Sequence, residues 1–151
     1  MTRWLIKNFS TLGPVGYFPV APGTFGTLTA AIFLFALKPS PLWHIAITLA
    51  VVLLGIAASG EAEKILGAKD SGHIVIDEFA GYLVSMAFLP HTTGYFISSF
   101  ILFRFFDILK PPPLRRLERL RGGAGVMMDD LMAGVYTNLI LQIWRLSVWS
   151  L

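Results

Sequence analysis

An apolar run over residues 42–59 most constrains the fold of this chain, because only His44 and Thr48 interrupt it over 18 residues. As a helix, the run would be about 27 Å long, close to the thickness of the hydrocarbon core of a bilayer. The composition agrees, since 55% of the 151 residues are apolar and 14% are charged, against roughly 45–50% and 25% in soluble domains. The sequence therefore predicts an integral membrane protein.

Further apolar segments surround this run, and turns that contain proline or glycine separate them. The predicted arms are residues 24–37, 41–59, 78–90, 94–109 and 131–149. Residues 3–12 carry a short amphipathic pattern that is typical of a helix at a membrane interface. We therefore expect one all-α domain over residues 1–151, a polytopic helical membrane protein with about four to five short apolar helices and an N-terminal interfacial helix.

Charged residues gather on one side of the membrane if successive arms cross it in alternating directions. The opposite side then receives only Lys38 and Arg145. The crowded side holds Arg3, Lys7, Glu61, Lys64, Asp77, Glu78, Arg104, Asp107, Lys110, Arg115, Arg116, Arg119, Arg121, Asp129 and Asp130. Because basic residues concentrate in short cytoplasmic loops, this side is predicted to face the cytoplasm.

Two adjacent carboxylates, Asp77 and Glu78, stand where an apolar arm begins. Charge beside a membrane segment is unfavourable unless it is paired, metal-bound or exposed to water, so the pair is a candidate functional site. Asp107, Asp129 and Asp130 fall on the same side, and five carboxylates brought together would repel one another unless cations intervene. Since the chain has no cysteine, oxygen ligands predict Mg²⁺ or Mn²⁺. Each acidic pair taken alone is equally consistent with a role at a helix N-terminus.

Basic residues that suit a phosphate group accompany these acids. Arg104, Asp107 and Lys110 recur at intervals of three, which places them along one side of a helix end and is also explained by an internal ion pair. Arg115 and Arg116 follow three prolines, and one arginine can bind two phosphate oxygens. Acidic side chains, basic side chains and a membrane-embedded chain together predict chemistry on the phosphate of an anionic lipid. No nucleic acid is expected as a partner.

A segment rich in glycine and threonine, residues 23–27, leads directly into the first apolar arm. Free backbone N–H groups and the hydroxyl groups of Thr24 and Thr27 would favour an anion at such a helix N-terminus. The alternative is a loop in which Thr24 or Thr27 acts as the N-cap of the helix.

Four blocks of the sequence resemble the phosphatidylglycerophosphatase A family, in that family's order. They are APGTFGT (21–27), IVIDEFAG (74–81), FRFFDILKPPP (103–113) and GGAGVMMDDLMAGVY (122–136). The resemblance implies a magnesium-dependent phosphatase, multi-pass in the bacterial cytoplasmic (inner) membrane, that converts phosphatidylglycerophosphate to phosphatidylglycerol. One position departs from the family pattern, since Pro112 stands where the family often has tryptophan.

The resemblance selects roles for the charged residues. The expected Mg²⁺ ligands are Asp77, Glu78, Asp129 and Asp130. The expected catalytic residues are Asp107, Asp129, Asp130, Arg104 and Lys110, with Asp107 either a ligand or a general base. The expected substrate-binding residues are Thr24, Thr27, Arg115 and Arg116.

Two mechanisms and three functions, the phosphatase among them, remain open at this point. Direct attack by a metal-activated water is the expected route, and a covalent aspartyl-phosphate is the alternative. His73 would either protonate the leaving alkoxide or form a local hydrogen bond in its loop. One alternative function is an ion or proton transport subunit, but a transport path would place its carboxylates near the middle of the membrane. The other is a non-catalytic membrane scaffold, which would tolerate neutralising substitutions such as Asp129→Asn.

Overall fold

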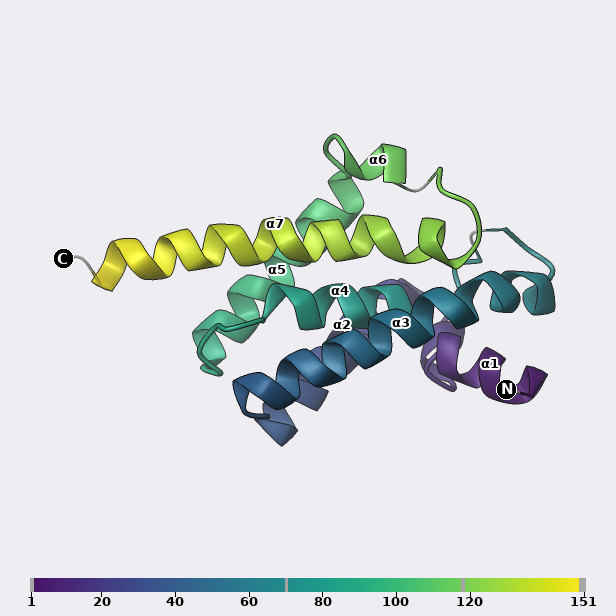
Figure 1. The fold of residues 1–151 in the computed structure, drawn as a ribbon, viewed down its shortest axis with the longest axis horizontal. Helices are drawn as coiled ribbons and strands as arrows, with labels where there is room; N and C mark the ends of the chain where they lie inside the picture. Colours follow the sequence, from purple (N-terminus) through teal and green to yellow (C-terminus); the bar gives the residue numbers. More distant parts are fainter. Residues whose placement is uncertain (1, 70, 118, 150–151) are drawn as a thin grey trace.

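The computed structural model describes residues 2–69, 71–117 and 119–149. Its elements are α1 (Arg3–Ser10), the 3₁₀ helix η1 (Val15–Tyr17), α2 (Pro22–Leu37), α3 (Pro41–Leu66), α4 (Ile76–Ser85), α5 (Thr93–Leu109), α6 (Leu114–Leu117) and α7 (Gly123–Trp149) (Figure 1). Every regular element in these residues is a helix, so the predicted all-α class is confirmed.

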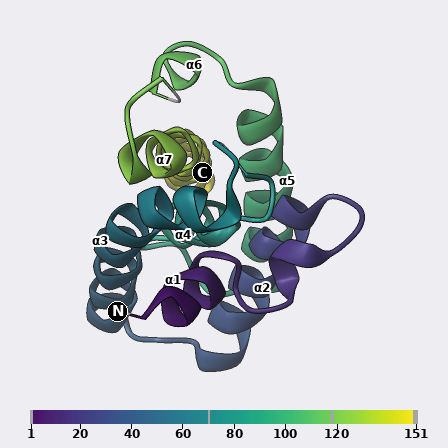
Figure 2. The ribbon, with the colours of Figure 1, turned by 90° about the vertical axis from the view of Figure 1, so that its right-hand side faces the viewer.

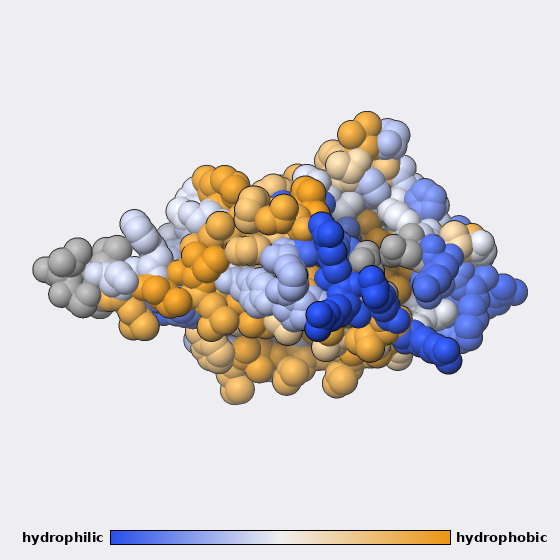
Figure 3. All heavy atoms as spheres, turned by 90° about the horizontal axis from the view of Figure 1, so that it is seen from above, coloured by the Kyte–Doolittle hydropathy of each residue, from blue (hydrophilic) through white to orange (hydrophobic). Residues whose placement is uncertain are grey.

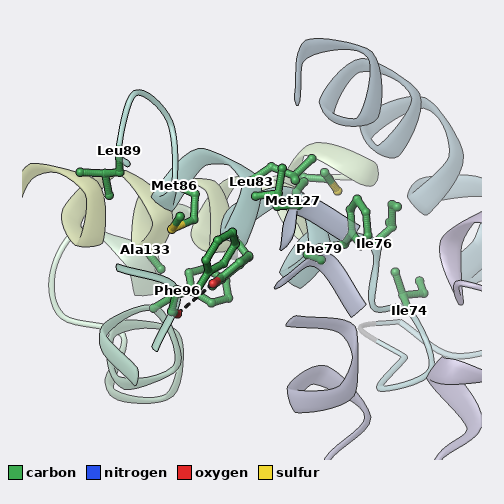
Figure 4. Packing of buried hydrophobic residues seen from close by; sticks show 14 of the residues in the cluster. Ile74, Ile76, Phe79, Leu83, Met86, Leu89, Phe96, Met127 and Ala133 are labelled. Atoms are coloured by element: carbon green, nitrogen blue, oxygen red, sulfur yellow. Dashed lines mark hydrogen bonds between the residues drawn. The ribbon is translucent and has the colours of Figure 1, made fainter. Parts of the chain in front are cut away.

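Helix α4 lies at the centre of the molecule, although it has only 10 residues. It packs against α2, α3, α5 and α7, which surround it in Figure 2. Its side chains Ile76, Phe79, Tyr82 and Leu83 are buried, and Figure 4 shows the hydrophobic cluster that they form with residues such as Met127 of α7. This packing fixes both ends of α4 relative to the longer helices.

The outer surface of the helices is largely apolar. The side chains of Trp43, Leu53, Ile101 and Trp144 are each more than half exposed. Figure 3 shows apolar residues over the middle of the molecule and hydrophilic ones toward the end that carries α1. Within the described residues, α3 is the one helix that is long and apolar enough to cross a membrane, by length and composition. These features fit a membrane-associated protein.

Three helix boundaries differ by several residues from those predicted, and two of these differences lengthen a helix. Helix α3 runs to Leu66, so the acidic stretch after residue 59 continues the helix. Helix α7 begins at Gly123 and not near residue 131, which places Asp129 and Asp130 in its second turn. Gly123 packs against α3 and does not break the helix, since a Cβ on Gly123 would collide with the carbonyl oxygen of Ile56.

Helix α4 ends at Ser85, earlier than the predicted arm of residues 78–90. Backbone that leaves a helix in apolar surroundings needs partners for its carbonyl groups. Asn138 of α7 supplies two, because its Nδ2 donates to the carbonyl oxygens of Ser85 at 3.0 Å and Ala87 at 2.8 Å. The shorter helix is thus capped by a side chain distant in the sequence.

Two more side chains of α7 continue this capping. Gln142 Nε2 donates to the carbonyl oxygen of Ala87 at 3.2 Å, and Arg145 Nη1 donates to that of Phe88 at 2.9 Å. Gln142 follows Asn138 by four residues and Arg145 follows Gln142 by three, and these intervals place the three donors along one side of α7. Helix α7 therefore holds the α4–α5 loop as well as α4 itself.

Candidate active site

Five carboxylates from three helices meet at one end of the molecule. They are Asp77 and Glu78 in the first turn of α4, Asp107 near the end of α5, and Asp129 and Asp130 in the second turn of α7. These five residues, which we call the acidic cluster, line a cavity of about 120 Å³ together with Lys110. The structure thus brings together the carboxylates that the sequence placed on one side.

Three members of the acidic cluster lie closest together. Asp77, Glu78 and Asp130 each offer one carboxylate oxygen, and these three oxygens all lie within 4.8 Å of one another. Asp77 Oδ1 also accepts a hydrogen bond from the backbone N–H of Glu78 at 3.1 Å, at a helix N-terminus where negative charge is favoured. This spacing suits three ligands of one cation better than three unpaired charges.

Burial and mutual repulsion disfavour the charged forms of these acids. Burial, followed by the neighbouring Glu78 carboxylate, raises the pKa of Asp77 well above its usual range. Burial, followed by the charges of Asp107 and Asp77, likewise raises the pKa of Asp130. A bound cation would oppose both shifts, because it favours the deprotonated forms.

Two basic side chains contact the acidic cluster. Arg104 Nη1 lies 2.5 Å from Asp107 Oδ2 and 3.9 Å from Glu78 Oε1. Lys110 Nζ lies 2.8 Å from Asp129 Oδ2, and Lys110 also lines the cavity. Among the described residues, five carboxylates therefore face two cations, which leaves an excess of negative charge for a further cation to neutralise.

The local backbone geometry directs Lys110 to this position. Lys110 is the C-cap of α5 and has a left-handed conformation with φ 45°, which glycine most often adopts at the end of a helix. Three prolines follow it and cannot continue the helix. The chain therefore leaves α5 at the point where the ammonium group reaches Asp129 of α7.

Two buried carboxylate oxygens of the acidic cluster, Glu78 Oε2 and Asp129 Oδ1, have no hydrogen-bond partner within the described residues. Buried polar atoms without partners are rare and unfavourable. A divalent cation that prefers oxygen ligands would satisfy both atoms. The donor set therefore fits a hard cation such as Mg²⁺.

The first turn of α2 packs directly on the acidic cluster, which was not predicted from the sequence. A Cβ on Gly23 would collide with Oε1 of Glu78 and lie 3.3 Å from Nη1 of Arg104. A Cβ on Gly26 would lie 2.9 Å from that of Val75. The interval of three residues between the glycines, which puts both on one face of a helix, was the available signal for this close approach.

The two threonines predicted to bind phosphate are not among the residues that line the cavity. Thr27 is fully buried and its hydroxyl donates to the carbonyl oxygen of Gly23 at 3.0 Å. Thr24 is half-buried in the first turn of α2. The N-cap of α2 is Ala21, so the alternative prediction, that Thr24 or Thr27 is the N-cap, was wrong.

Three other candidate residues also lie outside the cavity lining. Arg115 and Arg116 are exposed on α6, which packs against α7. His73 Nδ1 donates to the carbonyl oxygen of Gly16 at 2.8 Å, and its ring stacks on Tyr17 with 4.7 Å between centroids. His73 therefore lies in a loop, as predicted, but its hydrogen bond is not local, because Gly16 is 57 residues away in the sequence.

Comparison with known proteins adds a family relationship. The sequence model of the family described as Phosphatidylglycerophosphatase A matches residues 8–145. Proteins named Phosphatidylglycerophosphatase A from Haemophilus influenzae and Escherichia coli are each 34% identical to the chain, over 97% and 89% of it and 96% and 83% of their own lengths. A Bacteroides thetaiotaomicron protein, whose name proposes phosphatidylinositol-3-phosphatase activity, is 39% identical over 86% of the chain and 87% of its own length. No solved structure matches the chain significantly.

Proposed function

The chain belongs to the phosphatidylglycerophosphatase A family, and on that premise we propose that it removes the terminal phosphate of phosphatidylglycerophosphate to give phosphatidylglycerol. The observation that carries the proposal is the cavity of about 120 Å³ in which five carboxylates and Lys110 meet. The cavity is formed in part by the beginning of α7, which lies toward the side of the molecule that carries α1 (Figure 1), and Figure 3 shows hydrophilic residues on that side. There the phosphate of a membrane lipid would meet water.

Mg²⁺ is the proposed cofactor, and its proposed ligands are Asp77, Glu78, Asp129 and Asp130. Carboxylate oxygens are the ligands that Mg²⁺ prefers, and it binds phosphate together with one or two carboxylates. The unpartnered buried oxygens of Glu78 and Asp129 support this assignment. When bound, the ion would polarise the phosphoryl group and lower the pKa of the attacking water.

Lys110 is the proposed contact for a phosphoryl oxygen, because it lines the cavity. As the water oxygen bonds to phosphorus and the bond to the glycerol oxygen breaks, negative charge spreads over the phosphoryl oxygens, where an ammonium group stabilises it. Asp107 is the proposed general base for the water proton. Arg104 holds Asp107 and Glu78 without lining the cavity, so we assign it a positioning role. Attack by an aspartate to form an aspartyl-phosphate is the alternative.

We further propose that the chain crosses the bacterial cytoplasmic membrane several times, with the acidic cluster on the cytoplasmic side. Helix α3 has the length and composition of a membrane span, and α2 and α5 carry apolar residues over 16 and 17 residues. Basic residues concentrate at the end that holds the acidic cluster, whereas the opposite end has Lys38 and Arg145. That bias is typical of cytoplasmic loops.

A transport function is not favoured. A path for ions or protons would continue ionisable side chains from the acidic cluster toward the middle of the helices. Helix α4 instead continues with Phe79, Tyr82 and Leu83, which are buried in the core, and Phe103 of α5 is fully buried there as well. The carboxylates therefore form a pocket at one end of the bundle.

The lipid substrate is tested by comparing the hydrolysis of two phosphate monoesters. Phosphatidylinositol 3-phosphate is the rival, because the name of the Bacteroides relative proposes activity on it. The purified chain in detergent micelles with MgCl₂ would receive each lipid separately, and released inorganic phosphate would be measured. We expect kcat/KM to be at least about tenfold higher for phosphatidylglycerophosphate. A preference for the inositol lipid would replace the proposed substrate, and release from neither lipid would contradict a phosphatase.

A further inference from the structure

A second cavity, of about 390 Å³, lies at the end of the molecule opposite the acidic cluster. The α2–α3 turn, the α4–α5 loop and the last turns of α7 form it, and Pro39, His44, Phe88, His91 and Arg145 are among the residues that line it. Figure 1 shows the α2–α3 turn and the α4–α5 loop together at the lower left, far from the start of α7. We call this cavity the basic pocket, and it is separate from the candidate active site.

Positive and imidazole side chains surround the basic pocket. His44, His91 and Arg145 line it, and Lys38 lies in the adjoining α2–α3 turn, as the C-cap of α2. None of the nine acidic residues of the sequence lies in the segments that line the pocket. Among the described residues, no acidic side chain of these segments neutralises the charge of Arg145 and Lys38, which produces a positive potential that attracts anions.

Hydrogen bonds hold two of these side chains at the pocket wall. Arg145 Nη1 donates to the carbonyl oxygen of Phe88 at 2.9 Å, which orients a guanidinium group that has five N–H donors in all. His44 is nearly fully buried, and its Nε2 lies 2.9 Å from the carbonyl oxygen of Leu83. Its ring centroid lies 5.8 Å from that of His91. The pocket thus combines an oriented arginine with two neighbouring imidazole rings.

We propose that the basic pocket binds the phosphate-bearing headgroup of an anionic phospholipid, in the leaflet opposite the active site. Its volume lies within the range of roughly 300–1,000 Å³ that is usual for small-molecule sites. Arginine binds phosphate oxygens through two parallel hydrogen bonds, and basic pockets between membrane helices bind lipid headgroups. A lipid is favoured over a free phosphate ion because Leu42, Trp43 and Phe88 expose large apolar surfaces beside the pocket, where acyl chains would pack.

Binding of dioleoylphosphatidylserine tests this proposal, because the lipid is anionic and is neither the proposed substrate nor its product. The full chain in a neutral detergent would be titrated with it, with dioleoylphosphatidylcholine as the neutral comparison, and bound lipid would be measured by native mass spectrometry. We expect tighter binding of the serine lipid, and an affinity about tenfold weaker in Arg145→Gln and in His91→Gln. Arg3→Gln, which removes an exposed arginine of α1, should bind like the wild type.

The two pocket variants together distinguish the loss of a contact with the lipid from a change in the structure of the pocket. Arg145→Gln also removes the hydrogen bond to Phe88, whereas His91→Gln leaves that bond in place. Equal affinity of the wild type and both variants, or of the serine and choline lipids, would overturn the proposal. Full displacement of the serine lipid by millimolar inorganic phosphate would overturn the assignment to a lipid and leave a phosphate ion as the ligand. Retained binding in the presence of phosphate is the expected result.

Discussion

The ammonium group of Lys110 lies 2.8 Å from Oδ2 of Asp129 and so joins the end of α5 to the start of α7. The side chain of Asp129 is only 7% exposed, which means that water cannot readily replace a lost partner. Lys110 also lines the cavity of the acidic cluster. One ion pair therefore connects the stability of this end of the molecule to the proposed chemistry.

Lys110→Met is expected to lower kcat/KM for phosphatidylglycerophosphate by about 100-fold or more, because it removes the ammonium group that would contact the phosphoryl oxygen. It is also expected to lower the free energy of unfolding by about 3 kcal/mol, because it leaves the buried carboxylate of Asp129 unpaired. Phosphate release and thermal unfolding in detergent would measure the two effects. Lys64→Met is the matched control, since Lys64 and its partner Glu61 are both exposed, and it should change little. Activity of Lys110→Met equal to that of the wild type would refute the contact with substrate.

Gly23→Ala tests whether the position of the Glu78 carboxylate matters. The added methyl group would collide with Oε1 of Glu78 and displace it, so we expect activity to fall by about tenfold to 100-fold. Gly94→Ala is the control, because a Cβ on Gly94 in the first turn of α5 meets no atom within 4 Å. It should retain full activity and gain up to about 1 kcal/mol of helix stability. Equal activity of the two variants would show that α2 does not constrain the site.

Magnesium is expected to raise the melting temperature of the wild type. A ligand that binds only the folded state stabilises it by about 2.7 kcal/mol at 100 times its Kd. Asp130→Asn removes one of three mutually repelling carboxylates, so without metal it should melt above the wild type, and it should gain little from MgCl₂. Sodium chloride of equal ionic strength controls for screening. A wild-type melting temperature that does not respond to millimolar MgCl₂ would argue against the metal site.

Asn138→Leu is expected to lower the free energy of unfolding by about 1–3 kcal/mol, because it removes donors to the carbonyl groups of Ser85 and Ala87 at the end of α4. Asn8→Leu is the matched control, since Asn8 is in α1 and, within the part of the chain that the structure describes, its side chain donates only to the carbonyl oxygen of Trp4, one turn earlier at the surface. Chemical unfolding in detergent would compare the two. The same small effect in both variants would mean that the capping of α4 contributes little.

The acidic cluster was predictable because the side on which a residue falls depends only on the number of apolar segments before it, and not on where each segment begins or ends. In the predicted topology an even number of crossings separates Asp77 and Glu78 from Asp107, Asp129 and Asp130, so these carboxylates are expected on one side wherever the exact boundaries lie. The start of α7 was not predictable in the same way. Glycine breaks many helices, and only the contact of Gly123 with Ile56 explains why it begins one here.

The capping of α4 was also beyond the reach of sequence patterns. Asn138, Gln142 and Arg145 appear in the sequence as scattered polar residues of an apolar arm. Their role depends on the carbonyl groups of the α4–α5 loop, which lies about 50 residues earlier. Long-range hydrogen bonds of this kind follow from the packing of α4 against α7 and not from a local preference.

Phosphate release from phosphatidylglycerophosphate, measured with purified wild type, Asp129→Asn and Glu61→Gln in MgCl₂ and in EDTA, tests whether the acidic cluster hydrolyses this lipid with Mg²⁺. Glu61 is an exposed acid of α3 and serves as the control for loss of one negative charge. We predict release by the wild type and Glu61→Gln only with Mg²⁺, and at least about a 100-fold loss in Asp129→Asn despite a folded protein. Release that does not require Mg²⁺, or full activity of Asp129→Asn, would contradict the account.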